Sequence, residues 1–353
     1  MNALNCEKSL LSVNALNIDF QTDRGFAHVV KDVHFSIGFG ETFGLVGESG
    51  CGKSVTSRAL MGLIPSPGKV SSGAIELTPT PDDSSIDLLH CSEKELQRLR
   101  GQTIGMIFQE PDMALNPIMR VGDQIAETFL IQEHSHNNQT FIHRWISGLN
   151  RHKKQEYLIK SIELLKALDI PRAENVAQQY PHQLSGGMKQ RILIAIALAG
   201  TPSLLISDES TSSLDVSIQS QIIVLLDQLK KEQRIQSVLF ITHDLGLAAM
   251  CCTRLAVMYA GTMCEIGPVP DIFNHPKHPY TRALLETIPR KTRETNLKPI
   301  SGQVPDLVDA PDGCRFHPRC TQKMKKCEQE MPMMISEGEG HQMACWLYDS
   351  QCP

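Results

Sequence analysis

The sequence predicts an α/β fold built around a phosphate-binding loop, and three neighbouring segments support that prediction. Residues 42–46 form a short apolar run that is typical of a buried strand. A glycine-rich stretch over residues 47–54 follows it, and residues 54–63 have the pattern of a helix. Phosphate binding needs backbone N–H groups and a helix N-terminus that converge on one anion, and the order strand, loop, helix brings them together.

The glycine-rich stretch matches the pattern G-x-x-x-x-G-K-[ST]. In that pattern the backbone N–H groups cradle the phosphates, Lys53 reaches the β- and γ-phosphates, and the Ser54 hydroxyl holds Mg²⁺. A chance glycine-rich turn would lack the flanking strand and helix. The loop residues that we expect to contact a nucleotide are Gly47, Glu48, Ser49, Gly50, Cys51, Gly52, Lys53 and Ser54.

Three further apolar runs are each followed by polar residues. These residues are Gln109 after residues 104–108, the pair Asp208 and Glu209, and His243 after residues 237–241. In an open parallel sheet, ligands bind beyond the carboxyl ends of the strands, so we expect these polar residues to surround the phosphates. ATP hydrolysis needs neutralised phosphate charge and a positioned water molecule.

Each polar residue has a role in that chemistry. Asp208 and Ser54 could hold Mg²⁺ from opposite sides of the loop, and Glu209 could accept the proton of the attacking water. Gln109 could contact both the metal and the water, and His243 could reach the γ-phosphate. A helix cap or a satisfied histidine would explain any one of them, but the set together indicates a catalytic site.

A second motif narrows the class. Residues 184–191 read L-S-G-G-M-K-Q-R and precede an apolar helical run over residues 192–199. With the phosphate-binding loop and the Asp208–Glu209 pair, this chain resembles the ATP-binding-cassette (ABC) ATPases, with Met188 at the usual Gln position of their LSGGQ signature. The resemblance implies an α/β P-loop NTPase fold: a mixed sheet with an antiparallel β edge, and an all-helical subdomain at about residues 115–200.

The resemblance also implies residue roles and a partner. It makes Gln109 the Q-loop residue, Asp208 the Walker B aspartate, Glu209 the catalytic glutamate and His243 the switch histidine. The chain departs from the family at Ser210, where a proline commonly follows the catalytic glutamate. In the family, the signature loop of one cassette contacts the γ-phosphate held by another, so this chain would pair with a second ABC ATPase subunit, identical or related. The nucleotide-contacting residues implied in this way are Ser185, Gly186, Gly187, the D-loop Asp215 and, for the adenine ring, Phe26.

The rest of the chain divides at its polar and glycine-rich segments. We expect strands over residues 11–20 and 29–37, loop and hairpin over 65–81, and a helix from the capping box at Ser92 to Arg100. Further patterns predict helices over residues 121–131, 155–168 and 215–231, a solvated His-rich loop over 132–154, and two strands over 254–266.

The C-terminal part resembles a subfamily. His278-Pro279-Tyr280-Thr281 begins a segment similar to the HPYT-x-x-L of oligopeptide/dipeptide (and nickel) permease ATPases, and residues 109–117 also resemble them. We therefore expect a nucleotide-binding domain over residues 10–270 and a C-terminal extension over 271–353. The resemblance implies ATP-driven import of oligopeptides or dipeptides, with nickel or another small solute as the alternative cargo.

Four of the eleven cysteines form a spaced set in the C-terminal part of the chain: Cys314, Cys320, Cys327 and Cys345. A reducing compartment argues against disulfides, so the alternatives are a [4Fe–4S] cluster, Zn²⁺ or no metal. The spacing lacks the Cys-x₂₋₄-Cys hairpin usual for zinc, and the subfamily resemblance also favours the cluster. The segment is too short for a core of its own, so a metal centre would hold it together.

Composition bounds location and partners. The net charge of −5 gives no reason to expect nucleic acid as a partner. No apolar run reaches about 18 residues, and no signal peptide is recognisable. The resemblance to the permease ATPases implies a peripheral protein on the cytoplasmic side of the inner membrane, with two membrane permease subunits and an extracytoplasmic substrate-binding protein. A soluble DNA-repair ABC ATPase would need a long coiled coil between the phosphate-binding loop and the signature, and the insert here is too short for one. Ribosomal members usually carry two cassettes in one chain, whereas this chain has one.

Overall fold

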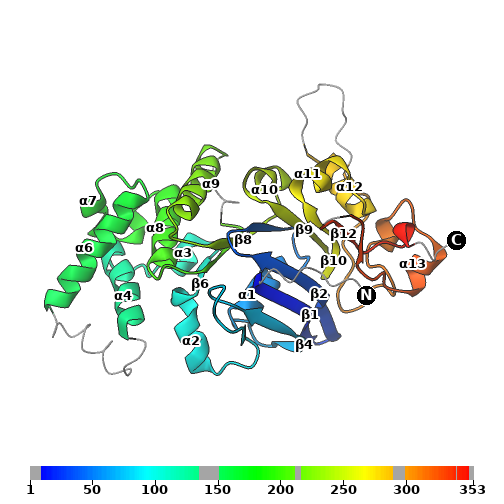
Figure 1. Cartoon of the computed structure of the whole chain (residues 1–353), viewed down its shortest axis with the longest axis horizontal. Helices are drawn as coiled ribbons and strands as arrows, with labels where there is room; N and C mark the ends of the chain where they lie inside the picture. Colours follow the sequence, from blue (N-terminus) through cyan, green and yellow to red (C-terminus); the bar gives the residue numbers. More distant parts are fainter. Residues whose placement is uncertain (1–8, 135–150, 211–215, 289–298, 339, 350–353) are drawn as a thin grey trace. The chain divides into compact units, whose positions relative to one another are not determined.

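A computed structural model of the chain describes residues 9–134, 151–210, 216–288, 299–338 and 340–349. The chain divides into two compact units (Figure 1). The first comprises residues 1–90 and 239–353, and the second comprises residues 91–238. Strand β8 (Ser237–Thr242) crosses the boundary between them in sequence.

An antiparallel sheet in the first unit has the order β2-β1-β4-β5. Its strands are β1 (Ser9–Thr22), β2 (Gly25–Gly38), β4 (Gly68–Leu77) and β5 (Ile86–Asp87). The prediction of loop and hairpin over residues 65–81 was wrong for β4. Its serines and glycines are typical of a loop, but the strand pairs along β1, and Ile75 and Leu77 are fully buried on the core face.

A second sheet in this unit carries the phosphate-binding loop. Strand β3 (Thr42–Val46) runs parallel to β9 (Arg254–Tyr259), and β9 pairs antiparallel with β10 (Thr262–Pro268). The C-terminal strands β12 (Gln342–Met343) and β11 (Ile335–Ser336) extend the edge beyond β10. The helices of this unit are α1 (Lys53–Leu60), α10 (Leu245–Cys251), α11 (Val269–Asn274), α12 (Pro279–Glu286) and α13 (Lys325–Gln329).

The second unit pairs strand β6 (Ile104–Ile107) in parallel with β7 (Leu204–Asp208), and most of the other regular structure among its described residues is helical. A cluster of Ala126, Leu130 and Tyr157, buried between α4 and α6, forms part of its core. Its helices are α2 (Glu93–Gln102), α3 (Pro111–Ala114), α4 (Val121–His134), α6 (Arg151–Ala167), α7 (Ala173–Ala177), α8 (Gly186–Leu198) and α9 (Val216–Lys231).

Most predicted elements are confirmed, with small shifts at their ends. The capping box of α2 forms as expected, since Ser92 Oγ accepts the Glu95 N–H and Glu95 Oε2 accepts the Ser92 N–H. Helix α1 was predicted to reach residue 63 but ends at Leu60, because Gly62 turns the chain with a φ of 61°. The predicted domain boundary at residue 270 stays a prediction. None of the helices in the described ranges has the length and apolarity that crossing a membrane requires.

Candidate nucleotide-binding site

Glycine is required at two positions of the phosphate-binding loop. Gly47 has a φ of 156°, and a Cβ there would lie 2.1 Å from the carbonyl oxygen of Met258. Gly52 has a φ of 101°, and a Cβ there would lie 2.9 Å from the carbonyl oxygen of Val29. Both the backbone conformation and the close approach of neighbouring chain therefore exclude larger residues.

The lysine of the loop folds back across it. The Lys53 side chain is buried, and its Nζ donates to the carbonyl oxygens of Gly47 (2.9 Å) and Glu48 (3.1 Å). Helix α1 begins at Lys53, and its N-cap Gly52 supplies no side-chain hydrogen bond. Because the N-cap is a glycine, no N-cap side chain covers this end of the helix, as expected at an anion-binding helix N-terminus, and Ser54 lies in its first turn.

In the second unit, two of the predicted catalytic residues are in contact. Strand β7 ends at the buried Asp208, and the half-buried Glu209 follows with a φ of 45°. Gln109 Nε2 donates to Glu209 Oε2 at 3.4 Å. Gln109, the predicted Q-loop residue, therefore lies beside Glu209, the predicted catalytic glutamate.

The serine that departs from the family pattern has a structural role. The hydroxyl oxygens of Ser207 and Ser210 lie 2.6 Å apart and are buried. This hydrogen bond closes the turn that contains Asp208 and Glu209. A proline at residue 210 could not make it.

The signature loop opens helix α8. Ser185 is the N-cap, and its Oγ accepts the Met188 N–H, while Gly186 is the first helical residue. A Cβ on Gly187 would lie 3.2 Å from Ile218 Cδ1, so little space is left there. Lys189 of α8 forms an ion pair with Asp112 of α3. The serine and both glycines are thus held at one helix N-terminus.

The remaining predicted site residues that the structure describes lie at the end of β8 and in the β1–β2 hairpin. His243 is exposed directly after β8, and Asp244 caps α10 by accepting the Leu247 N–H. Phe26 is half exposed near the tip of the β1–β2 hairpin, with Lys69 Nζ 5.9 Å from its ring centroid. Asp215 lies outside the described residues, as does most of the His-rich segment.

The pattern of the sequence did not reveal two side chains that support the phosphate-binding loop. The hydroxyl oxygen of Tyr280, in α12, accepts the backbone N–H of Glu48 at 3.0 Å. Arg319 Nη1 lies 2.7 Å from Glu48 Oε2. Burial raises the pKa of Tyr280, so its phenol stays neutral and can act as this acceptor. The resemblance to the HPYT segment pointed to the residues around Tyr280 but did not indicate that Tyr280 contacts Glu48.

The HPYT segment is held by a buried carboxylate. Glu265 in β10 is fully buried and accepts the N–H groups of Lys277 (2.7 Å) and His278 (2.9 Å). Its Oε1 also lies 2.7 Å from His341 Nε2. The His278 ring caps α12 by accepting the Tyr280 N–H, and burial, followed by the charge of Arg282, lowers its pKa to about 3.

We call residues 314–345 the cysteine module. The side chains of Cys314, Cys320, Cys327 and Cys345 line one cavity of about 10 Å³. Burial raises the pKa of Cys314 to about 12 and that of Cys345 to about 11. In the ranges that the structure describes, no three His, Cys, Asp or Glu side chains are arranged to hold one metal ion.

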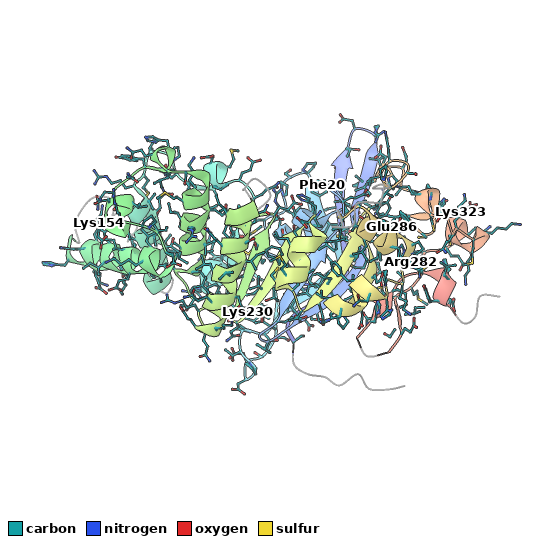
Figure 2. All side chains as sticks on the ribbon, turned by 90° about the horizontal axis from the view of Figure 1, so that it is seen from above. Phe20, Lys154, Lys230, Arg282, Glu286 and Lys323 are labelled. Carbon is teal, nitrogen blue, oxygen red and sulfur yellow. The ribbon has the colours of Figure 1, made fainter. Side chains whose placement is uncertain are left out.

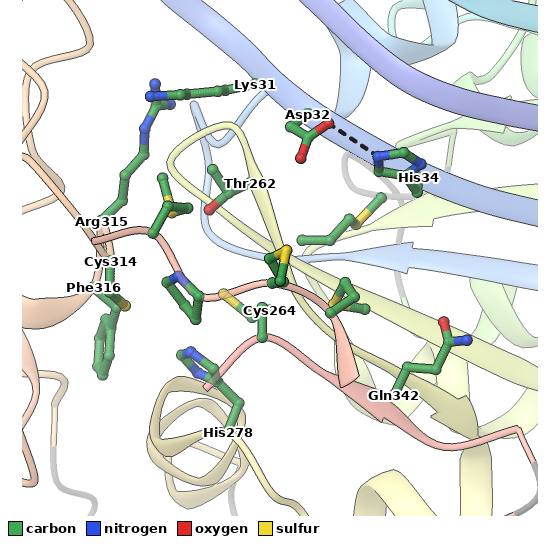
Figure 3. Close-up of a pocket in the computed structure, with 16 residues that line it drawn as sticks. Lys31, Asp32, His34, Thr262, Cys264, His278, Cys314, Arg315, Phe316 and Gln342 are labelled. Carbon is green, nitrogen blue, oxygen red and sulfur yellow. Dashed lines mark hydrogen bonds and ion pairs between the residues drawn. The ribbon is translucent and has the colours of Figure 1, made fainter. Parts of the chain in front are cut away.

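A larger cavity of about 520 Å³ lies beside the module (Figure 3). Its walls include Lys31 and His34 from β2, Cys264 from β10, and Cys314, which also lines the smaller cavity. Arg315 also lines it and donates to the carbonyl oxygens of His28 and Ala260. On this side the module is therefore joined to the sheets by hydrogen bonds around a cavity.

The HPYT segment and α12 are also tied to the C-terminal part of the chain. Arg282, labelled in Figure 2, donates through Nη2 to the Tyr348 hydroxyl and through Nε to the Pro276 carbonyl oxygen. Lys277 Nζ lies 2.9 Å from Glu337 Oε1. The HPYT segment and the chain's C-terminal part are thus held to each other by side chains on both.

Comparisons with known proteins agree with the motifs. The family model described as ABC transporter matches residues 30–212, and the one described as oligopeptide/dipeptide transporter, C-terminal region, matches residues 264–327. The dipeptide transport ATP-binding protein DppD of Bacillus subtilis is 43% identical over 98% of this chain and 96% of its own length. The oligopeptide transport ATP-binding protein OppD of Salmonella typhimurium is 41% identical over 92% and 90%.

A solved structure supports the fold. MJ0796, described as a bacterial ABC transporter cassette in dimeric form, matches 73% of this chain and 98% of its own with a TM-score of 0.60 and 23% identity. Because the two sequences are only 23% identical, this match shows a shared fold and says nothing further about function. The predicted cassette fold, with its mixed sheet and antiparallel sheet, is confirmed.

Proposed function

Because this chain belongs to the ABC transporter family of ATP-binding proteins, we propose that it is the ATP-hydrolysing subunit of an importer for oligopeptides or dipeptides. The loop over Gly47–Ser54 is the observation that carries the ATP-binding part of this proposal. It combines the required glycine conformations, a buried lysine, and a helix N-terminus without a side-chain cap. The peptide cargo is supported by the similarity to DppD and OppD along nearly the whole chain.

We assign the steps of hydrolysis to this chain's residues as follows. Lys53 and the loop N–H groups neutralise the phosphates, and Ser54, Asp208 and Gln109 are the groups suited to Mg²⁺, which offsets the phosphate charge when bound. Glu209 accepts the proton of the attacking water, and its contact with Gln109 Nε2 supports that role because the amide can orient the carboxylate. His243 acts on the γ-phosphate, and Phe26 stacks on the adenine.

A second cassette completes the proposal. The Ser185–Gly187 loop and Asp215 of each subunit would act on the nucleotide of the other, so closing two cassettes on two ATP molecules would be coupled to the transporter's cycle. The remaining partners are two permease subunits and an extracytoplasmic substrate-binding protein. Such a complex would place this chain at the cytoplasmic face of the inner membrane.

Uptake in cells tests the cargo. Cells that depend on this chain are given labelled dipeptides, labelled oligopeptides or nickel ions, and a Glu209→Gln strain serves as the matched control. We expect wild-type cells to accumulate peptide and the Glu209→Gln cells not to. Energy-dependent nickel accumulation without peptide accumulation would replace the peptide proposal with its alternative.

We further propose that the cysteine module holds a metal centre, with a [4Fe–4S] cluster favoured over Zn²⁺. The convergence of four thiols on one cavity supports this proposal. A cluster binds each cysteine to a different iron, so its sulfurs lie farther apart than those around a single zinc ion. The spacing of the four cysteines lacks the Cys-x₂₋₄-Cys hairpin usual for zinc, and this favours a cluster over Zn²⁺.

Metal analysis of the protein purified without oxygen tests the metal centre. We expect about four iron and four sulfide ions per chain, with charge-transfer absorption, and their loss in Cys320→Ser. Cys91→Ser is the matched control, because Cys91 lies outside the module. Stoichiometric zinc would identify the alternative, and protein with neither metal would contradict the proposal.

A further inference from the structure

We propose that the cysteine module positions the phosphate-binding loop, and that Arg319 is the residue through which it does so. This inference rests on the proposed ATP-binding function. Arg319 is adjacent to Cys320, so any change in the conformation of this part of the module acts on its backbone directly. Its guanidinium contacts Glu48, the second residue of the loop.

The guanidinium of Arg319 uses all five of its N–H donors. Nη1 donates to Glu48 Oε2 at 2.7 Å and to the Tyr259 hydroxyl at 3.2 Å, and Nη2 donates to Glu48 Oε1 at 3.2 Å. Nη2 also donates to the carbonyl oxygen of Ile300, and Nε to that of Ser301. A planar group bound on every side has one orientation, so its fork fixes the Glu48 carboxylate in both position and direction.

The ion pair is shielded from water. The Arg319 side chain is 5% exposed and the Glu48 side chain 26% exposed. Surface ion pairs are weak because water and salt screen them, and this pair is largely protected from both. The contact can therefore transmit a change in the module to the loop.

A second contact holds the same loop residue by its backbone. The Glu48 N–H donates to the Tyr280 hydroxyl, and the Tyr280 ring packs against Tyr259 with ring centroids 4.6 Å apart. Phe316 of the module packs edge-on against Tyr259, with ring centroids 5.2 Å apart, and at a tilt against Tyr280, with centroids 5.3 Å apart. Residues of the module therefore support both the side chain and the backbone contacts of Glu48.

Glu48 links this support to the phosphate-binding lysine. Its carbonyl oxygen accepts from Lys53 Nζ, and its N–H follows Gly47, whose carbonyl oxygen accepts from the same amine. Holding Glu48 thus limits the positions that the lysine and the loop N–H groups can take before nucleotide binds. Such preorganisation increases affinity because less ordering remains for the ligand to impose.

The test measures binding of a non-hydrolysable ATP analogue with Mg²⁺ to the full chain by calorimetry, together with steady-state ATPase rates. The variants are Arg319→Met, Arg319→Lys, Glu48→Gln and the Arg319→Met/Glu48→Gln double variant. Arg282→Met is the matched control, because Arg282 also joins the C-terminal part to the rest of its unit but makes no contact with the loop in the described structure. Thermal unfolding without nucleotide reports folding in each case.

We expect Arg319→Met to weaken analogue binding and raise KM by roughly tenfold, a typical size for coupling between sites, while kcat stays close to wild type. Arg319→Lys should bind the analogue more tightly than Arg319→Met does, since lysine keeps the positive charge but cannot donate two parallel hydrogen bonds to the Glu48 carboxylate. Adding Arg319→Met to Glu48→Gln should cause no further loss, because Arg319 acts through Glu48. Arg282→Met should bind the analogue as wild type does.

Three results would overturn the inference: wild-type affinity in Arg319→Met, an equal loss in Arg282→Met, or additive losses in the double variant. If Arg319→Met does not fold, the comparison of Arg319→Lys with Glu48→Gln still decides the question. Failure of the wild-type protein itself to bind the analogue would reject the proposed ATP-binding function as well. The two failures are therefore distinguishable.

Discussion

The backbone at Glu209 has a φ of 45°, which residues other than glycine rarely adopt. Such a conformation persists only where surrounding contacts enforce it, and it often marks a functional site. Here the buried hydrogen bond between Ser207 and Ser210 closes the turn, and Gln109 contacts the carboxylate. These contacts therefore hold Glu209 in a strained backbone conformation, which is consistent with its assignment as the general base.

At this residue the Glu209→Gln substitution should separate binding from hydrolysis. The amide can keep the contact with Gln109 but cannot accept a proton, so we expect ATP hydrolysis to fall by roughly 10²–10⁴-fold, the usual contribution of a general base. ATP binding should remain within a few-fold of wild type. A phosphate-release assay and an equilibrium binding titration measure the two quantities. Unchanged hydrolysis would assign the base to another residue.

Individual site residues were predictable where a local pattern carries the chemistry. The loop motif with its flanking strand and helix predicted the phosphate-binding residues, and the apolar strand before Asp208 and Glu209, with the family resemblance, predicted that pair. Tyr280 and Arg319 could not be assigned in this way, because they lie 232 and 271 residues from Glu48 along the chain. Only the fold shows that they contact the loop.

At the scale of elements, hydrophobic pattern and capping chemistry predicted most helices and strands. Strand β3 has the predicted bounds Thr42–Val46, and α2 begins at its predicted capping box. Strand β4 was missed because its sequence is rich in serine and glycine, while its pairing with β1 is a long-range contact. Tertiary pairing thus outweighed local composition there.

Helix α12 gives a prediction about pH. Its cap His278 is buried and neutral, with a pKa of about 3 against an ordinary 6.5. As pH falls from 6.5 towards 3, the unfolded chain takes up a proton that the folded chain does not, so stability is lost as pH falls. The loss for one such group approaches about 1.4 kcal/mol per pH unit.

Denaturant titrations at several pH values measure this effect. His278→Asn is the matched variant, because an asparagine oxygen can still accept the Tyr280 N–H while the group no longer titrates. The free energy of unfolding should depend less steeply on pH in His278→Asn than in wild type between pH 6 and 4. Parallel curves for the two proteins would contradict a neutral, buried His278.

At the scale of the whole molecule, the chain leaves its first unit at residue 90 and returns to it at residue 239. The phosphate-binding loop and the cysteine module therefore belong to one unit despite their distance in sequence. Motif order could predict the family and the set of site residues, whereas this discontinuous organisation depends on long-range packing that local patterns do not encode. It is also what allows a C-terminal arginine to support an N-terminal loop.

In the proposed function, this chain hydrolyses ATP within a complex of a second cassette and two membrane subunits. The most direct measurement is purification of tagged Glu209→Gln protein, with ATP, from detergent-solubilised membranes, followed by identification of its partners by mass spectrometry. Slow hydrolysis in this variant should preserve the closed, ATP-bound pair of cassettes. We expect a second cassette and two multi-span membrane proteins to be recovered with it. Recovery of soluble partners alone, or of no partner, would contradict the transporter assignment.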